Sequence, residues 1–300
     1  MQLFFRPTEN KYEGEGILPH GTFNNTNDWN PLIKYLEKGA IEFPDKTMFK
    51  MGDGNGKIIE QFTYKETNQR ANQIANYLIE NCSIQSEDKI GIFMLNSSEF
   101  VFSILATHKT GAIQVPVNKD EKGERLLYVI NYSEMKVLIV DKSAIDLIEP
   151  IASKFENLER IFISGSEGSI PSSLGNINCE KFESFNNGSI DNPDIELTIA
   201  NKERCMFTSG TTGMPKGVVR EHGGVLMTVR SYIQHQGIRS DDTLMSVLSL
   251  GHANAQAMCL FAAIGAGCTA VFFPKFSASN FWKWAHDCGA TVTNFLGAVA

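Results

Sequence analysis

Residues 208–217 read Thr208-Ser209-Gly210-Thr211-Thr212-Gly213-Met214-Pro215-Lys216-Gly217. The stretch combines glycines, a proline and hydroxyl side chains, which favour a loop over a helix or a strand. Such a loop suits an anion, because glycines let several N–H groups converge, hydroxyls add donors and Lys216 adds a positive charge. The sequence therefore predicts a polyphosphate-binding loop.

Two other phosphate-binding patterns do not fit this stretch. The Walker pattern requires a glycine before its lysine and a Ser or Thr after it, whereas Pro215 and Gly217 flank Lys216. The dinucleotide fingerprint G-x-G-x-x-G is also absent from the stretch. A Ser/Thr-rich surface turn is the simplest alternative. The ten letters closely resemble the TSGTTGxPKG signature of the adenylate-forming enzymes, which include acyl-CoA synthetases, peptide-synthetase adenylation domains and luciferases.

The resemblance extends from about residue 28 to the end of the sequence and implies a two-step reaction. A carboxylic acid attacks ATP to give an acyl-adenylate and pyrophosphate, and a thiol, usually that of CoA, then takes the acyl group. Mg²⁺ is expected to share the phosphate charge, with Thr212 as its protein ligand. The residues expected to bind the ATP phosphates are Thr208, Ser209, Gly210, Thr211, Thr212, Gly213 and Lys216.

Two further residues follow predicted strands, where ligand crevices form in open α/β sheets. For His252, the residues alone leave open a contact with a carboxylate or a capping role at the next helix. The resemblance implies a catalytic-site His that shapes the acyl pocket, although Ser249 and Gly251 replace the family's usual Pro and a common aromatic residue. Lys275 is either a solvated lysine or, by resemblance to CoA ligases, part of the CoA channel.

Composition narrows the class of protein. The chain has 42% hydrophobic and 20% charged residues and a formal net charge of −7, which argues against a nucleic-acid binder. Its six cysteines show no metal-ligand spacing, so they are expected to be free thiols in a reducing, cytoplasmic location. No apolar stretch is long enough to suggest membrane insertion, and the N-terminal apolar run is too short for a signal peptide.

Strand-like and helix-like stretches alternate, which predicts an α/β fold with two lobes of largely parallel sheet flanked by helices. Residues 1–27 are expected to form an N-terminal arm, and residues 28–195 a first α/β subdomain, of which 28–62 are free to pack with the second lobe. Residues 196–300 are expected to hold the phosphate loop and an incomplete second subdomain, without a C-terminal lid. Residues 164–193, rich in Ser, Gly, Asn and Pro, are predicted to be a linker.

The resemblance also implies that family members continue beyond residue 300, where their adenine and ribose contacts, a Mg²⁺-binding acid and the lid lysine lie. We therefore expect a truncated piece that completes neither step alone. The leading hypothesis is the N-terminal part of an ATP-dependent carboxylate–CoA ligase, similar to carnitine/crotonobetaine or fatty-acid CoA ligases. The alternatives are an adenylation domain that loads a carrier protein and a stand-alone nucleotide-binding module. The expected partners are a small carboxylic acid, ATP and CoA, and a homodimer is left open.

Overall fold

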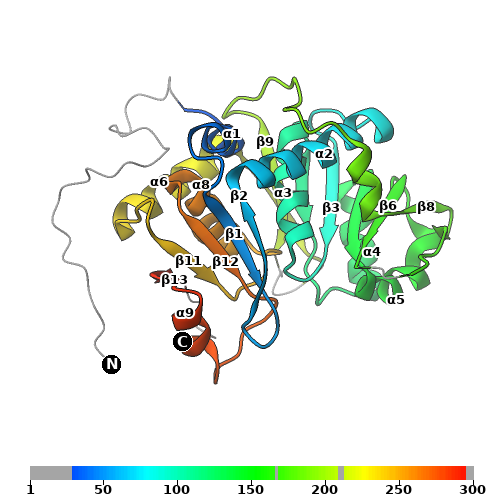
Figure 1. The fold of residues 1–300 in the computed structure, drawn as a ribbon. Helices are drawn as coiled ribbons and strands as arrows, with labels where there is room; N and C mark the ends of the chain where they lie inside the picture. The colour runs from blue at the N-terminus through cyan, green and yellow to red at the C-terminus, as the bar shows by residue number, and fades with distance from the viewer. Residues whose placement is uncertain (1–28, 166–167, 209–212, 295–300) are drawn as a thin grey trace.

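The computed structural model describes residues 29–165, 168–208 and 213–294, which form two sheets with helices packed against them (Figure 1). The larger sheet contains β3 (Lys89–Phe93), β4 (Ile113–Pro116), β5 (Val137–Asp141), β6 (Arg160–Ser164), β7 (Ser173–Leu174), β8 (Ile177–Lys181), β9 (Lys202–Thr208) and β10 (Lys216–Glu221). The smaller sheet contains β1 (Thr47–Gly52), β2 (Ile58–Thr63), β11 (Thr243–Ser246), β12 (Thr269–Phe272) and β13 (Val292–Thr293).

Both sheets are mostly parallel. The larger sheet has the order β10-β9-β4-β3-β5-β6-β8-β7, and its antiparallel pairs are the edge pairs β10–β9 and β7–β8. The smaller sheet has the order β13-β11-β12-β1-β2, with the β1–β2 hairpin antiparallel. The predicted α/β class with two largely parallel sheets is confirmed.

The helices connect and cover these strands. The α-helices are α1 (Leu32–Glu42), α2 (Tyr64–Cys82), α3 (Ser98–Thr110), α4 (Gly123–Ser133), α5 (Ile145–Ile148), α6 (His222–Gln236), α7 (Ala253–Ala255), α8 (Ala262–Ala266) and α9 (Phe281–Asp287). Tighter or wider turns form η1 (Lys142–Ala144), η2 (Glu149–Lys154), η3 (Phe182–Asn187) and the π-helical η4 (Gln256–Phe261).

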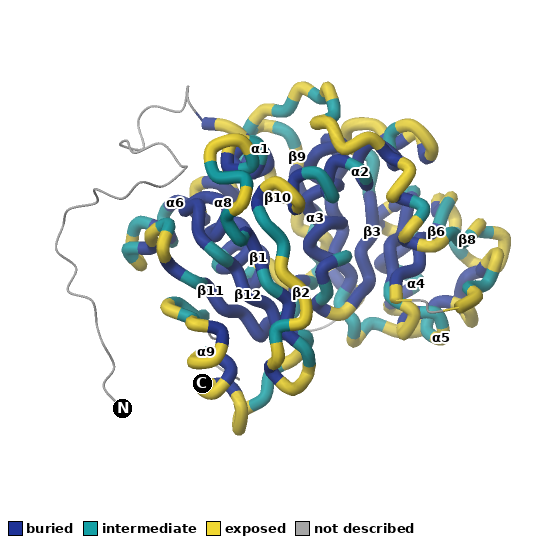
Figure 2. Tube along the Cα trace, viewed as in Figure 1, coloured by how far each residue is buried: buried dark blue, intermediate teal, exposed yellow. Residues whose placement is uncertain are grey.

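One hydrophobic core joins the two sheets. It takes buried side chains from α1, α2, α3, α6 and α8 together with residues of both sheets, such as Phe49 of β1 and Ile90 of β3. Figure 2 shows the consequence for the strands: central β3 is buried, whereas β10 at the edge is exposed along its length. The far faces of the sheets are covered by α4 and α9.

The sheets do not follow the order of the chain. β1 pairs with β12, with Phe49 opposite Ala270, so residues early in the sequence complete the smaller sheet. β9 pairs with β4, with Gln114 opposite Arg204, so the strands flanking the predicted phosphate loop extend the larger sheet. The predicted division near residue 195 thus differs from the boundary between the sheets, and the assignment of domains stays a prediction.

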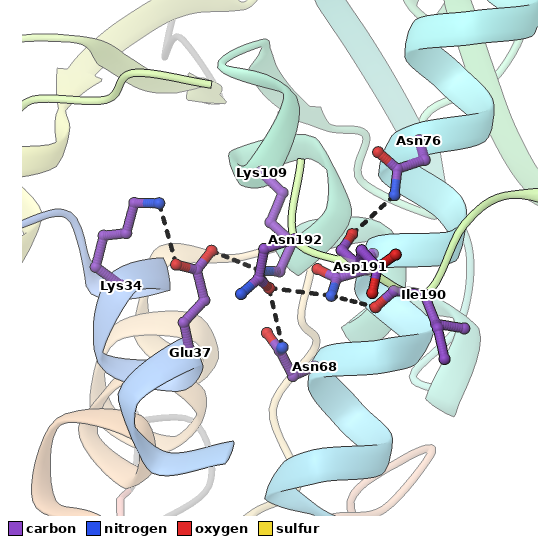
Figure 3. Close-up of polar contacts among 9 residues, drawn as sticks. Lys34, Glu37, Asn68, Asn76, Lys109, Ile190, Asp191 and Asn192 are labelled. Carbon is purple, nitrogen blue, oxygen red and sulfur yellow. Dashed lines mark hydrogen bonds and ion pairs between the residues drawn. The ribbon is translucent and has the colours of Figure 1, made fainter. Parts of the chain in front are cut away.

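The predicted linker is wrong, because most of residues 164–193 belong to the fold. β8 lies parallel to β6 in the larger sheet, and η3 packs Phe185 into the core. Asparagines of α2 then hold the next segment: Asn72 Nδ2 donates to the Ile190 carbonyl at 2.7 Å, and Asn76 Nδ2 to the Asp191 carbonyl at 2.9 Å (Figure 3). A Ser/Gly/Asn-rich composition cannot reveal partners that lie more than a hundred residues away.

Candidate active site

The structure brings the two ends of the predicted phosphate loop together. β9 ends at Thr208 and β10 begins at Lys216, and these two residues face each other across the antiparallel pair. The Thr208 hydroxyl donates to the Lys216 carbonyl at 3.4 Å. Thr208, Gly213 and Lys216 are all exposed, so their polar groups are open to a ligand. The predicted phosphate ligands Ser209, Gly210, Thr211 and Thr212 lie outside the described residues.

A cavity of about 390 Å³ opens beside this hairpin. Its walls come from β9 and β10 of the larger sheet, from α6, and from the segment that forms α7 and η4. The apolar side chains that line it are Met206, Val218, Val225, Ala253, Ala257 and Met258. The polar side chains that line it are Arg204, Thr208, Arg220, Thr228 and Asn254. A mostly apolar cavity with a few convergent polar groups is the usual form of a small-molecule site.

His252 lies next to this cavity in sequence and is exposed. It precedes α7, but its side chain makes no capping hydrogen bond, and its backbone N–H donates to the Ser249 carbonyl at 3.0 Å. The following residues, Ala253 and Asn254, line the cavity. The turn that carries His252 is therefore at the cavity, while the role of the imidazole stays a prediction.

Lys275 has a different position. It follows β12 and Phe273 at the carboxyl end of the smaller sheet, and its side chain is exposed. It is not among the residues that line the cavity. Lys275 is therefore outside the lining of the cavity beside the β9–β10 hairpin, and its contact with CoA stays a prediction.

The sequence analysis did not predict a buried chain of hydrogen bonds that joins the β9–β10 hairpin to the turn carrying His252. Arg204 of β9 is only 4% exposed and donates from Nη1 to Gln256 Oε1 at 2.8 Å. Gln256 Nε2 in turn donates to the Leu250 carbonyl at 2.7 Å. Through these contacts the strand that leads into the phosphate loop supports the turn at residues 249–252. The signal was present in the sequence as two adjacent charges, Glu203 and Arg204, inside a strand.

Glu203 and two histidines complete this cluster. The Glu203 carboxyl oxygens lie 3.3 Å from His108 Nε2 and 3.5 Å from Arg204 Nε. The rings of His108 and His222 meet edge to face, with centroids 5.4 Å apart. His108 is 1% exposed and is packed in the interior. His222 is also buried.

Burial decides the charge of the cluster, because it disfavours ionised groups. It raises the pKa of Glu203 to about 7, although Arg204 opposes the change. It lowers the pKa of His222 to about 4, helped by Arg204. It also lowers the pKa of His108 well below the usual range, and His222 and Arg204 lower it further. Both imidazoles are therefore neutral near pH 7, and Arg204 carries the main charge of the cluster.

The described residues contain neither a metal-binding cluster nor a membrane-spanning helix. Within residues 29–165, 168–208 and 213–294, no group of three or more His, Cys, Asp or Glu side chains could hold a metal ion. No carboxylate of these residues lines the cavity. Among the helices of the described residues, none is long and apolar enough to cross a membrane. All six cysteines are free thiols.

These features agree with a known enzyme family, whose profile matches residues 36–300. The chain belongs to the AMP-binding enzyme family. The match includes the loop, both flanking strands and the His252 turn, so the predicted resemblance is confirmed.

Curated relatives are CoA ligases. The chain is 27% identical over 269 residues to the crotonobetaine/carnitine–CoA ligase of Proteus mirabilis (strain HI4320), covering 89% of this chain and 50% of the relative. It is 28% identical over 255 residues to the enzyme of that name from Salmonella heidelberg (strain SL476), covering 85% of this chain and 48% of the relative. The chain thus spans about half the length of the curated relatives it matches.

Solved structures share the fold. An anthranilate CoA ligase in complex with anthranoyl-AMP superposes with a TM-score of 0.78 at 23% identity, covering 88% of this chain and 49% of the other. A long-chain-fatty-acid-CoA ligase from Archaeoglobus fulgidus gives a TM-score of 0.76 at 21% identity, covering 87% and 50%. The fold is therefore that of the N-terminal half of these ligases.

Proposed function

We propose that this chain supplies the phosphate-binding and acid-binding part of an ATP-dependent carboxylate–CoA ligase. In the first step a carboxylate oxygen bonds to the α-phosphorus of ATP, and pyrophosphate leaves. In the second step the CoA thiolate bonds to the acyl carbon, and AMP leaves. The observation that carries the proposal is the β9–β10 hairpin, which holds both ends of the signature loop beside a cavity. Membership of the AMP-binding family and the CoA-ligase relatives support it.

The loop is assigned to the ATP phosphates. Lys216 adds an ammonium at the start of β10, and Thr208 adds a hydroxyl at the end of β9. Gly213 is exposed, and a Cβ there would meet no atom within 4 Å, so its backbone is open to a ligand. Charge-assisted hydrogen bonds of this kind contribute about 1.5–3 kcal/mol each. Ser209, Gly210, Thr211 and Thr212 are assigned to the same phosphates on the motif alone.

Mg²⁺ would share the charge of the phosphates when bound. The described residues that line the cavity offer it no carboxylate, so its protein ligand in this part of the chain would be Thr212, outside the described residues. His252 is assigned to the acid pocket because its turn borders the cavity. Lys275 is assigned to the CoA channel. A cytoplasmic location and a homodimer stay predictions.

The test compares two matched lysine variants in ATP binding by the 300-residue chain. Lys216→Met removes the ammonium of the loop, and Lys122→Met removes an exposed lysine before α4. We expect calorimetry to show at least about tenfold weaker binding of ATP for K216M and unchanged binding for K122M. Equal affinities in the two variants would contradict the assignment of the loop.

Activity requires a second measurement, on the full-length protein. We expect AMP formation that depends on a carboxylic acid, with an acyl-CoA as product when CoA is present. AMP formation without any acyl-CoA product would instead favour transfer to a carrier protein. We expect the 300-residue chain alone to release no pyrophosphate, and acid-dependent release by it would contradict the prediction that it is incomplete.

A further inference from the structure

The wall of the cavity formed by the hairpin is a ladder of cross-strand pairs. In antiparallel strands, opposite residues share a face, and every second residue points to the same side. Three successive pairs on the cavity side are therefore Thr208–Lys216, Met206–Val218 and Arg204–Arg220. Four residues of antiparallel strand rise about 14 Å, which separates the loop end of this ladder from the arginine end. The ladder is polar at the loop, apolar in the middle and cationic at the far end.

The arginine pair places two positive charges opposite each other. Like charges directly opposite each other destabilise a sheet. Arg204 and Arg220 are opposite in register, and both line the cavity. Burial lowers the pKa of the Arg204 guanidinium, Glu203 opposes that change, and Arg220 lowers it further. Among the described residues lining the cavity there is no carboxylate that could separate the two guanidinium groups.

Existing contacts leave hydrogen-bond donors at this end of the cavity. Arg204 donates from Nη1 to Gln256 and its Nε lies in an ion pair with Glu203 at 3.5 Å, so within the described part of the chain its Nη2 keeps its donors for an occupant. Arg220 lies on exposed β10, where its guanidinium group is reachable from solvent. Arginine donors in a fork geometry suit a carboxylate or a similar planar or tetrahedral anion.

We propose that the cavity takes a carboxylic acid that carries a second anionic group at its far end, such as a dicarboxylic acid. The reacting carboxylate lies toward Thr208 and Lys216, the aliphatic part crosses Met206 and Val218, and the second anion bridges Arg204 and Arg220. This inference rests on the proposed function, because it names the substrate class of the same site. An acid with a cationic end is disfavoured, since it would meet two guanidinium groups.

The test measures acid-dependent AMP formation by the full-length protein with ATP and CoA. Adipate and suberate are compared with the monocarboxylates of equal length, hexanoate and octanoate, and with ε-aminocaproate, which ends in an ammonium. We expect kcat/KM to be at least about tenfold higher for a dicarboxylate than for its matched monocarboxylate, and lowest for ε-aminocaproate.

Two arginine variants show where the preference arises. Arg220→Met keeps an extended side chain without its charge, and we expect it to remove most of the preference by raising KM for the dicarboxylates only. Arg125→Met, in an exposed pair with Glu121, is the control and should leave the preference unchanged. Arg220 is exposed, so its replacement should affect binding more than folding.

The failures of the two proposals are distinguishable. Equal or better use of the monocarboxylates, or an unchanged preference in R220M, would overturn the inference while AMP formation still supported the ligase. AMP formation with none of these acids, but with another carboxylic acid, would overturn it in the same way. If no carboxylic acid supported AMP formation, both the inference and the proposed function would fall.

Discussion

His108 and Lys109 are consecutive residues of α3, yet they enter two buried polar clusters of different kinds. Lys109 is 2% exposed, and its Nζ lies 2.8 Å from Glu37 Oε1 and 3.2 Å from Asn192 Oδ1 (Figure 3). Glu37 also pairs with Lys34 at 3.0 Å, so each charge there has a partner. In the cluster around His108, by contrast, His108 Nε2 and both Glu203 oxygens make no hydrogen bond within the described part of the chain.

The two clusters differ in their place in the molecule: the Lys109 cluster is structural, and the His108 cluster lies beside the cavity. The Lys109 cluster joins α1, α3 and the segment before β9, and its polar contacts hold irregular chain in place. The His108 cluster lies against Arg204, which lines the cavity, and among the described residues its buried acid makes no hydrogen bond, whereas around Lys109 only the neutral Oδ1 atoms of Asn68 and Asn72 make none. Unsatisfied buried polar groups cost stability and are more common where function requires them. The first cluster should therefore respond to mutation mainly in stability, and the second in pH dependence.

The largest expected effect comes from Glu37→Gln. It leaves the buried Lys109 ammonium without its carboxylate, and we expect a loss of about 3 kcal/mol in the free energy of unfolding near neutral pH. The pKa of Lys109 is already lowered to about 8 by burial, and losing Glu37 lowers it further. Lys109 therefore loses its proton at a lower pH in folded E37Q than in the folded wild type, so the loss should shrink as the pH rises toward 8 and vanish above it, where Lys109 is neutral in both folded proteins.

Denaturant unfolding measures this loss, and Glu124→Gln is the matched control. Glu124 pairs with Lys154 at 3.3 Å, but its side chain is 79% exposed, so its replacement should cost about 0.5 kcal/mol or less. If E37Q were no more destabilising than E124Q, the Lys109 cluster would not be the structural element described here.

Glu203→Gln tests the second cluster. The pKa of Glu203 is raised from 4.5 to about 7, so its proton is held more tightly in the folded state. The protonated Glu203 therefore stabilises the folded state, and this contribution is fully present below pH 4.5 and is lost as the pH rises toward 7. We expect the cost of E203Q to be largest in acid and to decrease by about 2 kcal/mol toward neutral pH.

Unfolding of both proteins across that pH range measures the difference. The neighbouring histidines titrate in both, so their contribution cancels in the comparison. A cost of E203Q that stays constant with pH, or grows toward neutral pH, would show that Glu203 is not held as the neutral acid.

The smallest expected effect comes from Asn192→Ala. Asn192 Oδ1 accepts from Asn68, Asn72 and Lys109, and its loss should cost about 1 kcal/mol of unfolding free energy. Asn192→Asp keeps an acceptor oxygen and adds a charge beside Lys109, so it should be less destabilising than N192A. The reverse order of the two variants in denaturant unfolding would contradict the role given to Oδ1.

Local features of the sequence were sufficient for several parts of this molecule. A capping box, Thr63–Glu66, begins α2, with Glu66 N–H donating to Thr63 Oγ1 and Thr63 N–H to Glu66 Oε2. The alternation of short strands and helices gave the α/β class, and the ten-residue signature gave the family. These features can be recognised from the sequence because they depend on neighbouring residues. A capping box joins residues three positions apart, and each type of element has its own spacing of apolar side chains.

Only the tertiary structure decided which distant segments meet. It placed β1 against β12, added β9 to β4, and held residues 190–192 on α2. It also gathered His108, Glu203 and His222 into one buried cluster, and set Arg204 opposite Arg220 at the end of a cavity. The sequence alone cannot supply these contacts, because strand pairing and burial depend on residues far apart in the chain, and the same side chain is solvated or desolvated according to what packs over it.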